Sequence, residues 1–184
     1  MVSKIPLSLT YLRIIIIPFF VFAFFIPGEV GRWSACGTFV FACLTDYLDG
    51  KLARSLNQES KLGALLDPIA DKIIVAVALM LLIHDETIKD LTLFAALIII
   101  SREILVSGLR EFLASLQISL PVSSLSKAKT FIQMFALSVL LSGEPGNDLL
   151  YGYGRDLGLT SLWVSAVITV YTGYKYLIKG LKHV

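Results

Sequence analysis

Apolar residues occur in six long blocks along the chain, separated by short polar stretches. The blocks lie near 7–26, 33–55, 62–83, 89–115, 122–142 and 158–179. Crossing the hydrocarbon core of a membrane as a helix takes about 20 such residues. Long continuous blocks, without alternation over ten residues, argue against an outer-membrane β-barrel. The pattern therefore predicts an all-α polytopic membrane protein with six transmembrane helices.

The composition agrees with this interpretation. Of the 184 residues, 56% are hydrophobic, a more apolar balance than soluble domains usually have. No repeat or linker tract divides the chain, so residues 1–184 are expected to form a single domain. The net charge of +2 indicates no particular partner, and no nucleic-acid partner is expected.

The basic residues are distributed unevenly between the two ends of the blocks. With a cytoplasmic N-terminus, thirteen of the sixteen Lys and Arg residues fall on the cytoplasmic side, and only Arg32, Lys89 and Arg155 fall opposite. The positive-inside rule then puts both termini in the cytoplasm. The loops expected on the other side, GEV, HDETIKD and GEPGNDLLYGYGRD, are short and net acidic.

Four aspartates interrupt the apolar pattern between residues 45 and 72. Asp46 and Asp49 are three residues apart near the end of the second block, and Asp67 and Asp71 are four apart in the third. Residues at these spacings share one face of a helix. One such residue is often a solvated charge at the membrane boundary. Four on consecutive helices repel one another unless a cation compensates.

The chemistry of these side chains indicates which cation. Carboxylate oxygens with no His or Cys nearby suit a hard ion such as Mg²⁺ or Mn²⁺. Four carboxylates can hold two such ions a few ångströms apart, which clamps the attacking and leaving oxygens in phosphoryl displacement. The sequence therefore predicts a two-ion metal site at Asp46, Asp49, Asp67 and Asp71.

Small residues and one arginine accompany the aspartates. Gly50, Ala53 and Gly63 can simply permit close packing of helices. Beside a metal site they also leave room for a flat or phosphorylated ligand to approach the backbone. Arg54 offers a planar fork for a phosphate. Both interpretations of the small residues stay open at this point.

The fourth and fifth blocks carry cations toward their cytoplasmic ends. SREILVSGLRE contains Arg102 and Arg110, and SKAK contains Lys127 and Lys129. Glu103 shares a stripe of the helix with Arg110, because the two are seven residues apart. Positive-inside charge and pairing within a helix explain many such residues. The functional interpretation is a cationic pocket for an acceptor that carries its own phosphate.

The aspartates belong to a longer motif. The pattern D-x2-D-G-x2-A-R-x8-G-x3-D-x3-D, from Asp46 to Asp71, fixes eight positions over 26 residues. It resembles, without departure, the signature of the CDP-alcohol phosphotransferase family. The resemblance extends over most of the chain, including IPLSLTYLR, where relatives often carry an Asn near Ser8. SREILVSGLREFLA and SKAKTFIQMFAL are similar to the bacterial branch that makes phosphatidylglycerol phosphate.

The resemblance implies a fold and roles for the motif residues. Family members have six transmembrane helices, usually form homodimers, and open the active site to the cytoplasm with lateral access for lipid. Asp46, Asp49 and Asp67 would bind the metal ions, and Asp71 would bind metal and act as general base. The CDP group would be surrounded by Thr45, Gly50, Ala53, Arg54 and Gly63.

The same resemblance implies the substrates. CDP-diacylglycerol would donate the phosphatidyl group to sn-glycerol 3-phosphate by direct displacement, releasing CMP, in the inner membrane of a bacterium. The acceptor phosphate would be bound by Arg102, Arg110, Lys127 and Lys129.

Two kinds of alternative stay open. Another member of the family would use inositol phosphate, serine or phosphatidylglycerol as acceptor. A cation-coupled or proton-coupled transporter also carries carboxylates within a membrane. Transporters place ionisable groups near the midplane and often contain inverted repeats, whereas these carboxylates cluster at one side and no repeat is visible. The pattern favours the enzyme over the transporter, and over a purely structural membrane protein.

Overall fold

A computed structural model describes residues 5–56, 61–118 and 123–181 of the chain. Within those ranges it leaves out the side chains of residues 5–13, 46–56, 61–65, 67, 68 and 181. Six long helices are present: α1 (Ile5–Phe24), α2 (Glu29–Leu56), α3 (Lys61–His84), α4 (Thr92–Ser115), α5 (Ser124–Leu141) and α7 (Gly154–Leu181). A short helix, α6 (Gly143–Leu149), lies between α5 and α7. No strand occurs in the described ranges, which confirms the all-α prediction for that part of the chain.

Each predicted block corresponds to one long helix, and the main difference lies in the expected loop GEPGNDLLYGYGRD. Its first seven residues form α6. Glycine, proline and asparagine made a loop the natural expectation. Pro145 is the third residue of α6, and in the first turn of a helix a proline costs no intrahelical hydrogen bond.

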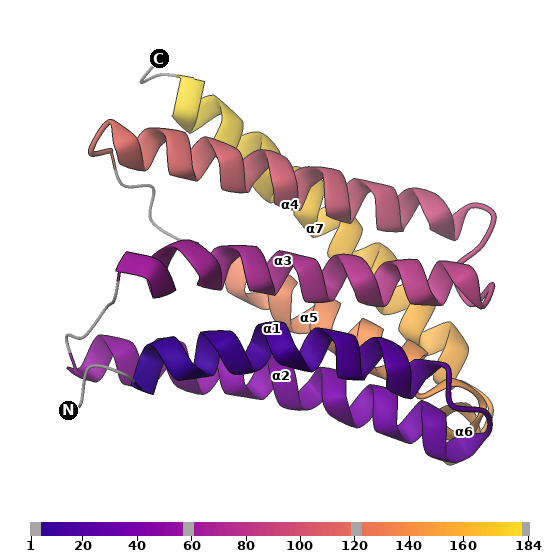
Figure 1. Cartoon of the computed structure of the whole chain (residues 1–184). Helices are drawn as coiled ribbons and strands as arrows, with labels where there is room; N and C mark the ends of the chain where they lie inside the picture. The colour runs from indigo at the N-terminus through magenta and orange to yellow at the C-terminus, as the bar shows by residue number, and fades with distance from the viewer. Residues whose placement is uncertain (1–4, 57–60, 119–122, 182–184) are drawn as a thin grey trace.

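The long helices lie side by side in one bundle (Figure 1). The start of α1 and the end of α7 lie at the same end of the bundle, and α6 lies at the opposite end. The end of α2 and the start of α3 also lie at the end that holds the start of α1. We call this the motif end of the bundle, because it carries the motif residues of α2 and α3, and we call the other the α6 end.

Apolar side chains fill the bundle and also cover it. The interior contains fully buried residues such as Phe20 and Phe39, whose ring centroids are 5.8 Å apart, and Leu137. Large apolar residues also face outward, among them Phe22, 71% exposed, and Phe131, 75% exposed. A soluble monomer rarely exposes so much apolar surface, so this surface is suited to lipid.

Two helices meet length and composition criteria for crossing a membrane within the described residues. They are α4 and the segment Gly154–Gly180 of α7. Of the remaining long helices, α2 and α3 contain the charged motif residues. Helix α1 contains a shorter apolar segment, Ile14–Phe24. The structure thus supports membrane character through two helices, and the prediction of six spans goes beyond it.

Candidate active site

The four motif aspartates lie on two consecutive helices at the motif end. Asp46 and Asp49 are in the second half of α2, and Asp67 and Asp71 are in the first half of α3. Both helices are continuous through these positions, so each pair shares one helix face, as the spacing predicted. Asp71 is half-buried. The side chains of Asp46, Asp49 and Asp67 lie outside what the structure describes.

The chemistry of the four carboxylates and their positions along the two helices indicate which ion they suit. Two carboxylate pairs, each on one face of a continuous helix, fit a hard divalent cation. Among the side chains that are described, no group of three or more His, Cys, Asp or Glu residues is close enough to hold a metal. Of the four aspartates, only Asp71 is among these described side chains, so the metal site stays a prediction.

The residues expected around CDP lie on the same two helices. Thr45 donates its hydroxyl to the carbonyl oxygens of Phe41 (3.0 Å) and Ala42 (2.8 Å), one turn back in α2. Gly50, Ala53 and Arg54 continue α2, and Gly63 opens α3, but their side-chain surroundings are not described. Their role toward CDP is untested.

Two of the four predicted acceptor cations are enclosed inside the bundle. Lys129, 3% exposed, is among the most buried charged residues described. Its ammonium forms an ion pair with Oε1 of Glu103 on α4. Nη1 of Arg102 lies 3.7 Å from the same oxygen. A buried charge needs a partner, and Glu103 supplies one for Lys129 and lies beside Arg102.

Arg102 is also anchored on α7. Its Nη2 donates to the hydroxyl of Thr172 at 3.2 Å, and its guanidinium carbon lies 5.7 Å from the ring centroid of Tyr176. Gly173 makes this approach possible, because a Cβ there would be 2.9 Å from Cγ of Arg102. Nε of Arg102 is buried without a hydrogen-bond partner among the described residues. Helices α4 and α7 are thus joined by one arginine.

The other two predicted acceptor cations, Arg110 and Lys127, are exposed. Arg110 lies toward the end of α4, the helix that follows α3 in the chain. Lys72 directly follows Asp71 in α3. Helix α4, which carries two of the predicted acceptor residues, contacts the helix that carries the predicted base.

Sequence reasoning missed the contribution of α7. Thr169, Thr172, Gly173 and Tyr176 lie at positions i, i+3, i+4 and i+7, which is one face of a helix. Thr169 and Thr172 are almost fully buried. A stripe of polar and small residues along an otherwise apolar helix was a usable signal that this face contacts polar groups rather than lipid.

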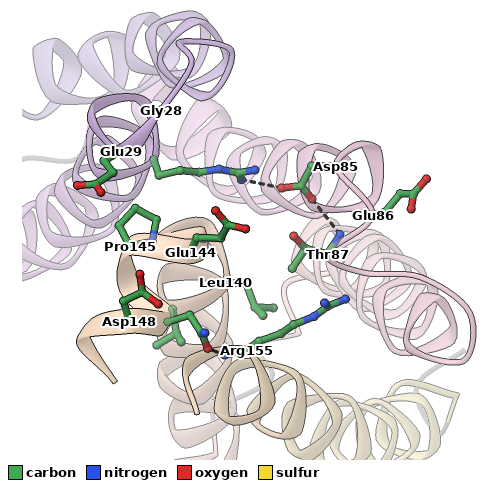
Figure 2. A pocket seen from close by; sticks show the side chains of 14 residues that line it. Gly28, Glu29, Asp85, Glu86, Thr87, Leu140, Glu144, Pro145, Asp148 and Arg155 are labelled. Atoms are coloured by element: carbon green, nitrogen blue, oxygen red, sulfur yellow. Dashed lines mark hydrogen bonds and ion pairs between the residues drawn. The ribbon is translucent and has the colours of Figure 1, made fainter. Parts of the chain in front are cut away.

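A separate pocket of about 660 Å³ lies at the α6 end. Its lining comes from the α1–α2 turn, the start of α2, the α3–α4 loop, α5, α6 and the start of α7, and contains none of the predicted site residues. Figure 2 shows Glu144 and Asp148 of α6 across from Asp85 and Thr87. The pocket is therefore distinct from the candidate active site.

Comparisons with known proteins bear on the motif directly. The family described as CDP-alcohol phosphatidyltransferase matches residues 3–171. The chain belongs to this family. The resemblance inferred from the motif is thereby confirmed, and the CDP-alcohol phosphatidyltransferase match covers every candidate site residue.

Three similar curated proteins share the name CDP-diacylglycerol–glycerol-3-phosphate 3-phosphatidyltransferase. The protein of Rickettsia felis is 42% identical over 175 residues, covering 95% of this chain and 93% of its own length. That of Rickettsia bellii is 43% identical with the same coverage. That of Pseudomonas fluorescens is 40% identical over 183 residues, covering 98% of this chain and 91% of its own.

Proposed function

We propose that this CDP-alcohol phosphatidyltransferase transfers the phosphatidyl group of CDP-diacylglycerol to sn-glycerol 3-phosphate, giving phosphatidylglycerol phosphate and CMP. The observation that carries the proposal is the similarity to relatives of that name at about 40% identity over nearly the whole chain. The contact between α3 and α4 supports it, because α4 carries Arg102 and Arg110, cations suited to a phosphorylated acceptor, and α3 carries Asp71.

The mechanism follows from the residues assigned to each substrate. Asp46, Asp49, Asp67 and Asp71 would hold two divalent ions, Mg²⁺ or Mn²⁺. When bound, the ions supply positive charge to the pyrophosphate and to the leaving CMP. Thr45, Gly50, Ala53, Arg54 and Gly63 would hold the CDP group.

Asp71 provides the base in this scheme. It removes the proton from the C1 hydroxyl of glycerol 3-phosphate. The hydroxyl oxygen forms a bond to the phosphorus on the lipid side of the pyrophosphate. The bond from that phosphorus to the bridging oxygen breaks, and the oxygen leaves with CMP.

The four cations would act on the acceptor phosphate in two different ways. Arg110 and Lys127 are exposed and would contact the phosphate directly. Arg102 and Lys129 are enclosed and would contribute positive charge from behind. An acceptor without a phosphate would not need this set of cations.

The proposal includes an architecture. Residues 1–184 would form one domain with six transmembrane helices and both termini in the cytoplasm, in the inner membrane of a bacterium. The outward-facing apolar side chains and the location of both ends of the helical chain at the motif end (Figure 1) support this arrangement. The protein would act as a homodimer with its active site open to the cytoplasm.

The decisive experiment measures CMP release by the purified protein from CDP-diacylglycerol. We expect release only with glycerol 3-phosphate and a divalent ion, loss in EDTA, and recovery when Mg²⁺ or Mn²⁺ is added back. Inositol phosphate, serine and phosphatidylglycerol are offered as alternative acceptors in parallel. Faster release with any of these would contradict the proposed acceptor while leaving the family chemistry in place.

A further inference from the structure

Glu103 is a carboxylate in a region that the proposed function assigns to an anionic acceptor. Its Oε1 pairs with the ammonium of Lys129 on α5 and lies 3.7 Å from Nη1 of Arg102. A negative charge beside a phosphate site weakens phosphate binding by Coulomb repulsion. Its presence there calls for a reason other than phosphate affinity.

Burial shows which of the three charges faces outward. The side chain of Glu103 is 23% exposed, whereas those of Arg102 and Lys129 are 13% and 4% exposed. Of the three, the carboxylate is therefore the most accessible to a ligand, and the two cations are more enclosed. They offset its charge and restrict its movement, and because both contacts use Oε1, Oε2 can accept a hydrogen bond from a ligand.

Hydrogen-bond chemistry indicates what such a ligand group would be. Arginine and lysine side chains only donate hydrogen bonds. They match phosphate oxygens but cannot accept from a hydroxyl. Glycerol 3-phosphate has a second hydroxyl, on C2, next to the C1 hydroxyl that reacts. Glu103 lies on α4, which contacts α3, the helix of the proposed base, so a carboxylate acceptor is available on the neighbouring helix.

We propose that Glu103 determines acceptor specificity by accepting a hydrogen bond from the C2 hydroxyl of the acceptor. The inference rests on the proposed function and adds a hydroxyl contact to the phosphate contacts. Lys129 then acts chiefly as the counter-charge that holds Glu103. Arg102 is held from the opposite side by Thr172 and Tyr176 of α7.

The test compares two acceptors that differ only in that hydroxyl. Glycerol 3-phosphate and propane-1,3-diol monophosphate both have a primary hydroxyl and a phosphate, and only the first has the C2 hydroxyl. We expect the unaltered protein to prefer glycerol 3-phosphate in kcat/KM by about 10- to 100-fold, as for a hydrogen bond to a charged group. In Glu103→Gln this preference should fall about fivefold or more, because a neutral acceptor binds a hydroxyl less strongly.

The ratio of kcat/KM for the two acceptors distinguishes a role of Glu103 in specificity from a purely structural role. A change that only perturbs the fold or the local charge lowers or raises kcat/KM for both acceptors alike and leaves the preference unchanged. Glu86→Gln is the matched control, since Glu86 is exposed in the α3–α4 loop at the α6 end (Figure 2). It should keep the preference of the unaltered protein.

A second variant covers the case in which Glu103→Gln does not fold. Glu103→Met combined with Lys129→Met removes both members of the ion pair, while Arg102 keeps its hydrogen bond to Thr172 and its contact with Tyr176, and replacing a whole ion pair often preserves a fold. Its preference should lie within about twofold of unity, as expected when the hydrogen bond is absent. An unchanged preference in a folded variant, or none in the unaltered protein, overturns the role of Glu103 alone. Failure of glycerol 3-phosphate to elicit CMP overturns the proposed function as well.

Discussion

The guanidinium of Arg32 on α2 lies 2.6 Å from the carboxylate of Asp85, just after the end of α3. The guanidinium also lies 4.7 Å from the ring centroid of Phe24 on α1. Oδ1 of Asp85 accepts from the backbone N–H of Thr87, which fixes the start of the α3–α4 loop. The ion pair and the contact with Phe24 together connect α1, α2 and the end of α3 at the α6 end, far from the motif residues.

Asp85→Asn should destabilise the bundle without changing its chemistry. The side chains of Arg32 and Asp85 are 29% and 12% exposed, so the variant leaves a mostly enclosed guanidinium without its counter-charge. The expected loss is roughly 1–3 kcal/mol of unfolding free energy, measured by denaturant unfolding in detergent. Glu86→Gln is the control, because its pair with Lys89 is 4.0 Å long and exposed, and such pairs contribute little. Equal stability of the two variants would contradict the prediction.

Substitution by alanine should have different effects on thermal stability at Gly31 and at Gly37 of α2. A Cβ at Gly31 would lie 1.8 Å from the backbone oxygen of Ile26 and 2.7 Å from its carbon. Because this neighbour is backbone, Gly31→Ala must distort the α1–α2 turn and should lower the melting temperature by several degrees or more. At Gly37 no atom of the described residues, apart from its own stretch of helix, lies within 4 Å of a Cβ, so Gly37→Ala should be neutral or slightly stabilising in a helix. Thermal unfolding of both variants in one detergent checks the contrast.

The sequence predicted the helices well because apolar blocks reflect a property of each segment alone. It also predicted which aspartates share a helix face, since the spacing fixes that geometry. It did not predict α6, where Gly143, Pro145 and Asn147 suggested a loop.

The contacts between helices could not be predicted from the spacing of residues along the sequence. Arg102 and Thr172 are 70 positions apart, and Glu103 and Lys129 are 26 apart. Spacing shows which residues share a face but not which face meets which helix. The charges on α4 were therefore identified as a set, whereas the pairing that encloses Arg102 and Lys129 and leaves Arg110 exposed required the structure.

Asp71→Asn should abolish turnover while preserving the fold. The amide has nearly the same shape as the carboxylate, but it cannot take a proton from the acceptor hydroxyl and is a weaker metal ligand. CMP release should fall by at least about 100-fold, the lower range for removing a general base. Asp90→Asn is the matched control, because Asp90 is exposed before α4 with a φ of 49°, a conformation that Asn tolerates. Near-normal turnover in a folded Asp71→Asn protein would exclude Asp71 as the base.

Arg110→Ala should weaken acceptor binding far more than donor binding. Arg110 is exposed on α4, which contacts the helix of the proposed base, so it can meet a phosphate arriving between α3 and α4. Loss of a charge-assisted contact should raise KM for glycerol 3-phosphate about tenfold or more, with KM for CDP-diacylglycerol within about twofold. Initial rates of CMP release, with each substrate varied in turn, give both values. Arg155→Ala removes another exposed arginine, at the α6 end (Figure 2), and should change neither KM. If Arg110→Ala raised both KM values equally, the residue would be acting on the whole site and not on the acceptor phosphate.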